Sequence, residues 1–230
     1  MSTPLAIVGY GKMGHLVEQL APQYGFAVRA TLTSANIREL SRESLNGASI
    51  AVEFTMPSAA LANLQALAAL GVSTVCGTTG WWSQLPEVRA AIAAANTGLV
   101  YSANFSIGVN LFLDAVATAA KSFANHPEYE AWGWEIHHSA KKDAPSGTLN
   151  ALAQEIRSSG YTRTLTLSSN RAGANPGTHE IGFDSPADTI TLRHTARSRE
   201  GFARGALRAA QWLAGKKGVH EFRNILGELN

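Results

Sequence analysis

The fold is decided near the N-terminus by the stretch Leu5-Ala6-Ile7-Val8-Gly9-Tyr10-Gly11-Lys12-Met13-Gly14. Its apolar beginning predicts a buried β-strand, and its glycines follow the spacing Gly-x-Gly-x-x-Gly. Leu16, Val17 and Leu20 then continue at helical spacing, so the turn opens a helix. A strand, a glycine-rich turn and a helix in this order are typical of dinucleotide-binding folds, because the helix N-terminus offers free N–H groups to a pyrophosphate.

A glycine-rich turn also has a plainer interpretation, since it can join a strand to a helix without binding any ligand. The position directly after a first strand favours the dinucleotide. We therefore expect the whole turn to contact a dinucleotide cofactor through Gly9, Tyr10, Gly11, Lys12, Met13 and Gly14.

Further short apolar runs alternate with helical patterns through the first half of the chain. The runs expected to be strands are residues 26–32, 49–54, 72–76 and 98–101. Strands separated by helices indicate right-handed βαβ units, so we predict a Rossmann-like parallel sheet in an α/β fold.

The rhythm of the sequence changes after Asn104. A long helix is expected first, with Leu111, Phe112, Val116 and Phe123 at roughly helical spacing. Runs that look like antiparallel strands follow at residues 129–137, 162–168, 178–183 and 188–196, with a helix after Ser146 and another from about residue 200 to 215. We predict a second α+β domain built on an open mixed sheet.

Composition excludes several classes of protein. The 230 residues carry a formal net charge of +2, with 19 basic and 17 acidic residues scattered along the chain, which argues against a nucleic-acid surface. One cysteine, Cys76, excludes an intramolecular disulfide and any multi-cysteine metal site. Neither a signal peptide nor an apolar run long enough to span a bilayer is found, so we expect a cytoplasmic protein that binds no membrane.

The end of the second strand bears on the choice of cofactor. A strict NAD site needs an acidic residue there for the ribose 2′-hydroxyl, whereas this chain has Thr33 and Ser34. Two hydroxyls together with Arg29 or Arg38 suit a 2′-phosphate, although Arg29 is equally compatible with a solvated strand position. We predict NADPH, or tolerance of both NADPH and NADH.

Two other loops are candidates for the same ligand, because open α/β sheets bind ligands outside the carboxyl ends of their strands. One holds Gly77, Thr78 and Thr79, and the other holds Ser102, Ala103, Asn104 and Phe105. The alternative for the first loop is a tight turn in which a threonine caps a helix.

The segment Glu135-Ile136-His137-His138-Ser139-Ala140-Lys141-Lys142-Asp143-Ala144-Pro145-Ser146-Gly147-Thr148 concentrates proton donors and positive charge. Histidine suits proton transfer near neutral pH, and lysine can neutralise a carboxylate. Ser146 is expected to cap a helix whose Gly147 and Thr148 N–H groups form a small anion site. The alternative is a solvated polar loop. Only Glu135 and His137 share a face of the strand, so we expect no metal site.

These residues resemble the signature of the dihydrodipicolinate reductases, also called 4-hydroxy-tetrahydrodipicolinate reductases. The specific part is the pattern H-H-x-x-K-x-D-A-P-S-G-T, and the likeness extends over almost the whole chain. It includes Val52-Glu53-Phe54-Thr55-Met56-Pro57 and Asn104-Phe105-Ser106-Ile107-Gly108-Val109-Asn110, and it continues at His194-Thr195-Ala196-Arg197-Ser198-Arg199.

The resemblance implies an oxidoreductase that reduces a small cyclic dicarboxylate, 4-hydroxy-tetrahydrodipicolinate, with NADPH or NADH in diaminopimelate and lysine biosynthesis. It implies His137 as general acid/base and Lys141 as proton donor, with His138, Gly147 and Thr148 binding the carboxylates. It also implies a dinucleotide-binding domain of residues 1–104 plus about 201–230, and a substrate-binding and oligomerisation domain of residues 105–200. A homotetramer is expected.

The sequence differs from the family in two places, and two alternative functions are open. The chain lacks the acidic residue followed by arginine that often ends the second strand in the family, and its region between Gly25 and Ser49 is short. Another Rossmann reductase, such as an amino-acid dehydrogenase, is the alternative within enzymes. A dinucleotide-sensing module without catalysis is the alternative outside them, and it would not need His137 and Lys141.

Overall fold

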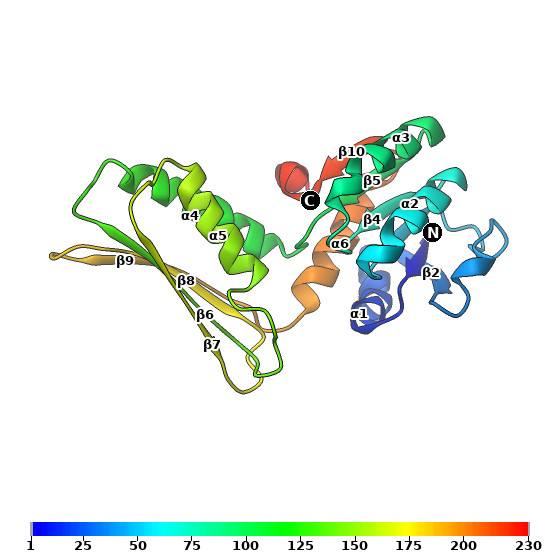
Figure 1. Ribbon diagram of the computed structural model, residues 1–230. Helices are drawn as coiled ribbons and strands as arrows, with labels where there is room; N and C mark the ends of the chain where they lie inside the picture. The colour runs from blue at the N-terminus through cyan, green and yellow to red at the C-terminus, as the bar shows by residue number, and fades with distance from the viewer. Residues whose placement is uncertain (1, 230) are drawn as a thin grey trace. The chain divides into compact units, whose positions relative to one another are not determined.

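The chain forms two units in the computed structural model, which describes residues 2–229 (Figure 1). The first unit ends at Ser106 and resumes at Glu200, so the C-terminal segment rejoins it. The second unit spans Ile107–Arg199. No helix in residues 2–229 combines the length and the hydropathy that a bilayer span requires.

A parallel sheet forms the centre of the first unit. Its strands lie in the order β10-β5-β4-β3-β1-β2, and each neighbouring pair is parallel. Their bounds are Thr3–Val8 (β1), Phe26–Leu32 (β2), Ile50–Glu53 (β3), Ser73–Cys76 (β4), Gly98–Tyr101 (β5) and Gly218–Glu221 (β10). The predicted Rossmann-like sheet is confirmed, with strand ends within about two residues of those expected.

Helices connect these strands and cover the sheet (Figure 1). The α-helices of the first unit are Lys12–Leu20 (α1), Pro57–Ala69 (α2), Leu85–Ala95 (α3) and Glu200–Leu213 (α6). Short 3₁₀ helices lie at Ala21–Tyr24 (η1), Ile37–Glu39 (η2), Trp82–Gln84 (η3) and Phe222–Glu228 (η4). Pro57 stands at the first position of α2, where its missing N–H leaves no intrahelical bond unmade.

The order of the strands defines where this sheet can bind a ligand. The chain runs from β1 to β2 on one side, and β3 then pairs with β1 on the other side. Ligands of open α/β sheets bind outside the carboxyl ends of the strands at such a reversal. The glycine-rich turn after β1 lies at this point.

The second unit pairs a mixed sheet with two helices. Its elements are Ile107–Phe123 (α4), Glu130–His137 (β6), Gly147–Ser158 (α5), Leu165–Arg171 (β7), Thr178–Asp184 (β8) and Thr189–Thr195 (β9). The strands lie in the order β7-β6-β8-β9. The expectation that these runs are antiparallel is wrong for one pair, since β6 and β7 are parallel. Helix α5 connects them as a crossover, which returns the chain to the sheet in the same direction.

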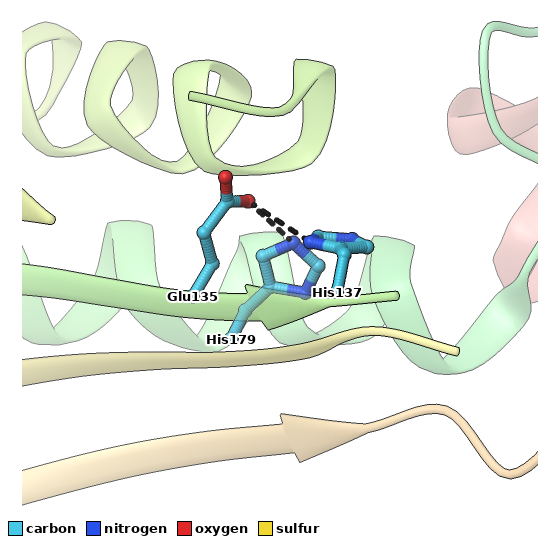
Figure 2. A group of neighbouring side chains, drawn as sticks. All are labelled: Glu135, His137 and His179. Carbon is cyan, nitrogen blue, oxygen red and sulfur yellow. Dashed lines mark ion pairs between the residues drawn. The ribbon is translucent and has the colours of Figure 1, made fainter. Parts of the chain in front are cut away.

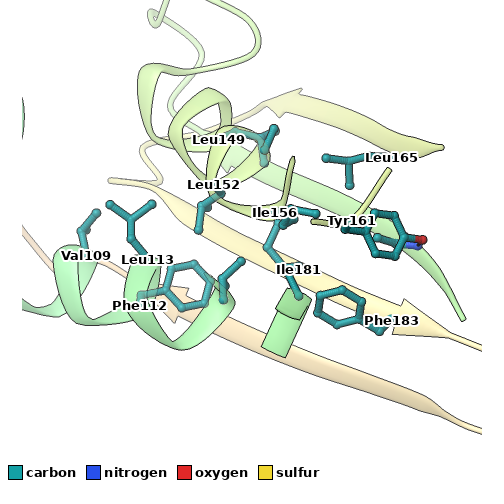
Figure 3. Close-up of a cluster of buried hydrophobic side chains, with 14 residues drawn as sticks. Val109, Phe112, Leu113, Leu149, Leu152, Ile156, Tyr161, Leu165, Ile181 and Phe183 are labelled. Carbon is teal, nitrogen blue, oxygen red and sulfur yellow. Dashed lines mark hydrogen bonds between the residues drawn. The ribbon is translucent and has the colours of Figure 1, made fainter. Parts of the chain in front are cut away.

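Alternation along β6 separates the two faces of this sheet. Ala131, Gly133, Glu135 and His137 are buried, while the residues between them are half-buried. The buried apolar side chains pack with α4 and α5 around Phe112, Leu152, Ile181 and Phe183 (Figure 3). Glu135 and His137 therefore stand at the polar end of an otherwise apolar face.

Two details of the sequence analysis are corrected by the structure. Leu111 was grouped with the apolar positions of the long helix, but it is 54% exposed because it faces away from the buried stripe of α4. Strand β10 was not anticipated. It has only four residues and pairs along the edge of the sheet with β5, so it carries little alternating pattern.

Replacing Gly205 with alanine should destabilise the first unit. A Cβ at this position of α6 would lie 1.7 Å from the backbone oxygen of Phe105, so the helix would have to shift. We expect Gly205→Ala to lower the free energy of unfolding by about 1–3 kcal/mol, measured by urea denaturation. Gly201→Ala on the same helix is the matched control, because its nearest neighbour would be 3.5 Å away. The control should be neutral or slightly stabilising, and equal destabilisation of both variants would contradict the prediction.

Candidate active site

A cavity of about 560 Å³ opens at the carboxyl ends of β1, β2 and β3 in the first unit. Its lining includes Gly9, Tyr10 and Gly11 from the predicted dinucleotide loop, and Thr33 and Ser34 from the end of β2. The sequence analysis did not assign several other lining residues, which are Val8, Leu32, Ile37, Thr55, Met56, Ala59 and Asn63. Most of these follow β3 or belong to α2, and only the strand order reveals that they adjoin the loop after β1.

The glycines of this loop have steric roles that fit a dinucleotide. Gly9 adopts a φ of +93°, and a Cβ there would lie 2.0 Å from the backbone oxygen of Phe54. A Cβ on Gly14 would lie 2.4 Å from the backbone oxygen of Gly9, so Gly14 lets helix and loop approach closely. Gly11 is the N-cap of α1, and a Cβ there would meet nothing within 4 Å. The backbone of Gly11 is thus open to an approaching phosphate.

The part of the cavity beside β2 has the composition of a phosphate site. Arg38 lines the cavity together with Thr33 and Ser34, and none of the lining residues is acidic. Arg38 has no hydrogen-bond or ion-pair partner within residues 2–229. Arg29, the other arginine that the sequence suggested, is exposed on β2 and is not among the lining residues.

The other predicted cofactor residues do not line this cavity. Lys12 is exposed at the start of α1, and Met13 is half-buried on the same helix. Thr78 is buried and accepts a hydrogen bond from the Thr55 N–H at 2.7 Å, so it ties the loops after β3 and β4 together. A Cβ on Gly77 would overlap the Phe54 ring, and Thr79 is exposed.

The loop after β5 is held by its own polar groups. The Ser102 hydroxyl donates to the Asn104 carbonyl at 2.8 Å and accepts from the Asn104 N–H at 3.0 Å. Ala103 is exposed between them. Phe105 is 1% exposed and packs against Phe222, so its side chain belongs to the core of the first unit.

A buried carboxylate supports the loops beneath this cavity. Glu53, the last residue of β3, has no exposed surface and no cationic partner within residues 2–229. It accepts hydrogen bonds from the Thr55 hydroxyl, from the Asn63 amide at 3.4 Å and from the Cys76 thiol at 3.1 Å. Burial raises the pKa of Cys76 well above its usual value, and the neighbouring Glu53 charge adds to the shift. Cys76 is therefore a buried hydrogen-bond donor.

In the second unit, Glu135 lies at the centre of a polar cluster on the helix-facing side of the sheet. One carboxylate oxygen, Oε1, accepts from the Ser146 N–H at 2.8 Å, the Ser169 hydroxyl at 2.9 Å and the Arg171 guanidinium at 2.8 Å. The other, Oε2, accepts from the Ser146 hydroxyl. It also lies 3.5 Å from His137 Nδ1 and 3.3 Å from His179 Nε2 (Figure 2).

His179 is a member of this cluster that the sequence analysis missed. It stands on β8 directly opposite Glu135 in the antiparallel register, and its ring centroid is 4.9 Å from that of His137. The signal available in the sequence was a histidine within a predicted strand, and the pairing register that brings it to Glu135 is a tertiary property.

Glu135, His137 and His179 also form a group in which three potential metal-ligand atoms lie within 4.8 Å of one another. The sequence analysis found only two of these on one face. Arg171 already contacts the carboxylate at 2.8 Å, however, so a divalent cation would share that group with a guanidinium. Ion pairing and hydrogen bonding account for the arrangement without a metal.

The loop after β6 presents the predicted lysine. Lys141 Nζ forms an ion pair with Asp143 at 2.7 Å, and its side chain is 24% exposed. Arg171 donates to the Asp143 carbonyl as well as to Glu135, so it links this loop to the buried cluster. His138 is half-buried at the end of β6, whereas His137 is only 7% exposed.

The start of α5 has the form that the sequence predicts. Ser146 is its N-cap, and its hydroxyl accepts from the Leu149 N–H at 3.2 Å. Gly147 is exposed and Thr148 half-buried at the first turn, where unpaired N–H groups favour an anion. Because Ser146 also donates to Glu135, the helix start and the buried cluster are one hydrogen-bonded assembly.

The pKa values of Glu135, His179 and His137 are all lowered, which favours an ionised carboxylate and neutral imidazoles. Burial alone would raise the pKa of Glu135, but hydrogen bonds from Ser146 and Arg171 lower it to about 2. Burial lowers the pKa of His179 to about 4, with a further contribution from His137. Burial also lowers the pKa of His137, although the Glu135 charge opposes the shift. Near pH 7, Glu135 is thus ionised and His179 neutral.

Comparison with known proteins finds matches over both halves of the chain. Residues 3–105 match the family described as dihydrodipicolinate reductase, N-terminus, and residues 108–226 match dihydrodipicolinate reductase, C-terminus. The chain belongs to the dihydrodipicolinate reductase family. The resemblance found in the sequence is therefore confirmed, as is the prediction of an oxidoreductase.

Curated relatives cover the whole length of the chain. The 4-hydroxy-tetrahydrodipicolinate reductase of Christiangramia forsetii is 31% identical, with 98% of both chains covered. That of Thiobacillus denitrificans is 33% identical, with 99% of both chains covered. Membership of the dihydrodipicolinate reductase family is thus a property of both units.

Solved structures share the fold. The dipicolinate-bound dihydrodipicolinate reductase of Paenisporosarcina sp. TG-14 has a TM-score of 0.83 at 23% identity and covers 98% of this chain and 100% of its own. The amine dehydrogenase of Mycobacterium smegmatis has a TM-score of 0.65 at 10% identity, covering 97% of this chain and 96% of its own. At these identities the likeness concerns the fold.

His179 should make the stability of the second unit depend on pH between about 6.5 and 4. Its pKa is about 4 in the folded chain against an ordinary 6.5, so the unfolded chain binds the proton first as the pH falls. The free energy of unfolding therefore falls as the pH drops from 6.5 to 4, by on the order of 3 kcal/mol from this histidine. Glu135 acts in the same direction at lower pH, between about 4.5 and 2.

We expect His179→Gln, which keeps a donor at the Nε2 position but does not titrate, to flatten this dependence in denaturant unfolding at pH 7, 6, 5 and 4.5. Glu135, His137 and His194 remain around the site and retain their own titrations. His126→Gln is the control, because His126 is exposed and its ion pair is with Glu128, outside the Glu135 cluster. A slope in His179→Gln equal to that of the unchanged protein would contradict the assignment.

Proposed function

We propose that this chain catalyses the reduction of 4-hydroxy-tetrahydrodipicolinate to tetrahydrodipicolinate with NADPH or NADH, in diaminopimelate and lysine biosynthesis. The reaction consumes one hydride and one proton and releases the substrate hydroxyl as water. One observation carries the proposal: a single segment of the second unit holds a buried imidazole (His137), an ammonium group (Lys141) and an open helix N-terminus. Full-length similarity to curated reductases supports it.

In this proposal the first unit binds the dinucleotide. The Gly9–Gly14 loop and the N-terminus of α1 hold the pyrophosphate, since Gly11 leaves the backbone open there. Thr33, Ser34 and Arg38 hold the adenosine ribose, and the lack of an acidic side chain in the cavity lining supports NADPH as a cofactor. The loops after β4 and β5 complete the site. The bound cofactor supplies the hydride.

The second unit binds the substrate in this proposal. The substrate carries two carboxylates, and the segment offers His138, Lys141 and the N–H groups of Gly147 and Thr148 to receive them. A substrate carboxylate takes the place of Asp143 on the Lys141 ammonium group, because the two are chemically equivalent partners. Fixing both carboxylates presents one face of the ring to the reductant, and such positioning lowers barriers by about 7–11 kcal/mol.

Proton transfer is assigned to His137, with Lys141 as proton donor. The lowered pKa of His137 keeps the neutral ring available near neutral pH, and the adjoining Glu135 charge supports the protonated form during transfer. Proton transfer by a positioned side chain contributes about 10²–10⁴-fold to a rate.

We also propose a cytoplasmic homotetramer assembled through the sheet of the second unit. Helices α4 and α5 lie on one side of that sheet (Figure 1). On its other face, Trp132 and Trp134 alternate with the buried residues of β6 and are half-buried. Large aromatic side chains on an uncovered sheet face favour an interface. Light scattering of the purified protein tests this, and a monomer would contradict it.

Two alternative functions can be tested against this proposal, an amino-acid dehydrogenase and a dinucleotide-sensing module. An amino-acid dehydrogenase would oxidise an amino acid with NADP or NAD, and the shared fold of an amine dehydrogenase does not favour it at 10% identity. A dinucleotide-sensing module would bind NADPH without consuming it. Oxidation of NADPH or NADH with enzymatically generated 4-hydroxy-tetrahydrodipicolinate, followed by absorbance, identifies the reductase. A panel of amino acids with NADP and NAD then separates the dehydrogenase from the sensing module.

His137→Gln and Lys141→Ala should each lower kcat by about 10²–10⁴-fold, because each removes a proton-transfer group. NADPH should bind both variants as tightly as the unchanged protein, measured by fluorescence titration. Lys142→Ala is the matched control, since Lys142 is the exposed neighbour of Lys141 with no partner in residues 2–229. Unchanged turnover in both variants would refute these roles.

Arg38→Ala should raise KM for NADPH by about 10-fold or more, the effect of losing one charged hydrogen bond. KM for NADH should change less than about twofold, since NADH has no 2′-phosphate. Arg29→Ala is the control, because Arg29 is exposed on β2 and does not line the cavity. Equal changes for the two cofactors in Arg38→Ala would show that this arginine does not read the 2′-phosphate.

A further inference from the structure

We propose that Glu135 is a positioning residue for the reaction, which holds His137 as the tautomer protonated on Nδ1 and so leaves Nε2 to exchange the proton. This inference rests on the proposed role of His137. It assigns a function to a carboxylate that has no exposed surface.

The two carboxylate oxygens of Glu135 have different partners. Oε1 receives the Ser146 N–H, the Ser169 hydroxyl and the Arg171 guanidinium. Two of these groups, the amide and the guanidinium, can only donate. Oε1 is therefore held as an acceptor, and Oε2, which accepts from the Ser146 hydroxyl, faces the two imidazoles.

His137 meets this carboxylate with one ring nitrogen only. Nδ1 is buried, lies 3.5 Å from Oε2 and has no other polar partner within residues 2–229. An ionised carboxylate accepts and cannot donate, so it favours the neutral ring that carries its proton on Nδ1. The distance is longer than a typical hydrogen bond, and catalytic hydrogen bonds commonly tighten when substrate binds.

Gly177 lies beside the opposite edge of the His137 ring. A Cβ there would lie 2.9 Å from His137 Nε2, so any larger residue would crowd this nitrogen. Gly177 precedes β8, the strand that carries His179. A glycine at this position thus keeps a side chain from crowding Nε2, the nitrogen that our proposal assigns to proton exchange.

The same carboxylate also fixes the start of α5. Both the N–H and the hydroxyl of Ser146 donate to Glu135, and Ser146 is the N-cap of that helix. One buried group therefore sets the orientation of the proton-transfer residue and the place of the Gly147 and Thr148 N–H groups. In a catalytic triad a buried carboxylate orients the histidine in the same way. Here the carboxylate also holds the helix start that forms the anion site.

Occupation of Glu135, His137 and His179 by a metal ion is the competing explanation. Their potential ligand atoms lie within 4.8 Å of one another. Arg171 already neutralises the carboxylate from 2.8 Å, and a second cation beside a guanidinium is unfavourable. The geometry favours the orienting carboxylate.

Glu135→Gln tests the proposal with little change in shape. The donors around the Oε1 position require the amide oxygen there, so the NH₂ group must face the imidazoles. A donor opposite Nδ1 should force His137 into the tautomer protonated on Nε2. This tautomer cannot accept a proton on the side that our proposal uses, and the equivalent change in a triad lowers turnover by about 10⁴-fold.

The primary measurement is ¹⁵N NMR of the full chain with ring-labelled histidine. Seven histidines give the signals, and His137→Gln identifies those of His137. We expect Nδ1–H in the unchanged protein and Nε2–H in Glu135→Gln. An Nε2–H tautomer in the unchanged protein would overturn the proposal without any variant, so poor folding of Glu135→Gln leaves the test intact.

The second measurement separates a positioning role from a structural one. Glu135→Gln should lower kcat at least 10-fold while KM for the dicarboxylate substrate changes less than threefold, because the amide oxygen retains the hydrogen bond from the Ser146 N–H at the start of α5. Ser169→Ala is the matched control. It removes a hydrogen bond to Oε1, not to the imidazole side, and should keep both the Nδ1–H tautomer and kcat within threefold.

Loss of the Nδ1–H tautomer in Ser169→Ala, or a normal kcat in Glu135→Gln, would overturn the role. If the chain fails to reduce the cyclic imine, the NMR result still decides the orientation of His137, so the two failures are distinguishable.

Calorimetric titration of chelator-treated protein with Zn²⁺ tests the competing metal explanation. Stoichiometric binding abolished by Glu135→Gln would make Glu135 a metal ligand and overturn the proposal.

Discussion

The arrangement of the second unit depends on a buried carboxylate beside the start of α5. Glu135 has no exposed surface, and its pKa of about 2 means that it remains charged at neutral pH. Burying a charge without partners is strongly unfavourable, so its surroundings must supply donors from several elements at once. Ser146 comes from the start of α5, Arg171 from the end of β7 and His179 from β8. Satisfying one carboxylate thus fixes three elements relative to β6.

The first unit handles a buried carboxylate differently. Glu53 lies at the end of β3, much as Glu135 lies near the end of β6. The hydrogen bonds to Glu53 come from a hydroxyl, an amide and the Cys76 thiol, and no cation pairs with it among the described residues. In both units the carboxylate lies under the loops that follow the carboxyl ends of the strands. Loops are mobile unless the scaffold holds them, and polar groups anchored in the core provide this support.

Much of the fold follows from periodicity and glycine spacing. The strands of the first unit are recognisable because buried parallel strands are continuous apolar runs between helical patterns. The Gly9–Gly14 loop is recognisable by its glycine spacing, because neither Gly9 nor Gly14 leaves room for a Cβ. Strand β10 and the parallel pairing of β6 with β7 were missed, since a four-residue edge strand and a pairing direction leave little periodic signal.

The candidate site divides in the same way. The segment from Glu135 to Thr148 is contiguous, so its histidines, lysine and helix cap could be read directly from the sequence. His179, Arg171 and Gly177 complete the same cluster from 36 or more positions further along the chain, and nothing in their local sequence points to it. Strand register alone brings them there, because a shift of one residue would turn His179 to the opposite face.

By itself, the order of residues determined the fold class, the glycine-rich turn at residues 9–14, the family and the chemical types gathered between residues 135 and 148. Tertiary structure alone decided which lining residues join that loop, and which oxygen of Glu135 faces an imidazole. The reason is physical. Periodicity and backbone sterics act over a few neighbouring residues, whereas hydrogen-bond direction depends on donors that meet only after the sheet has formed its register.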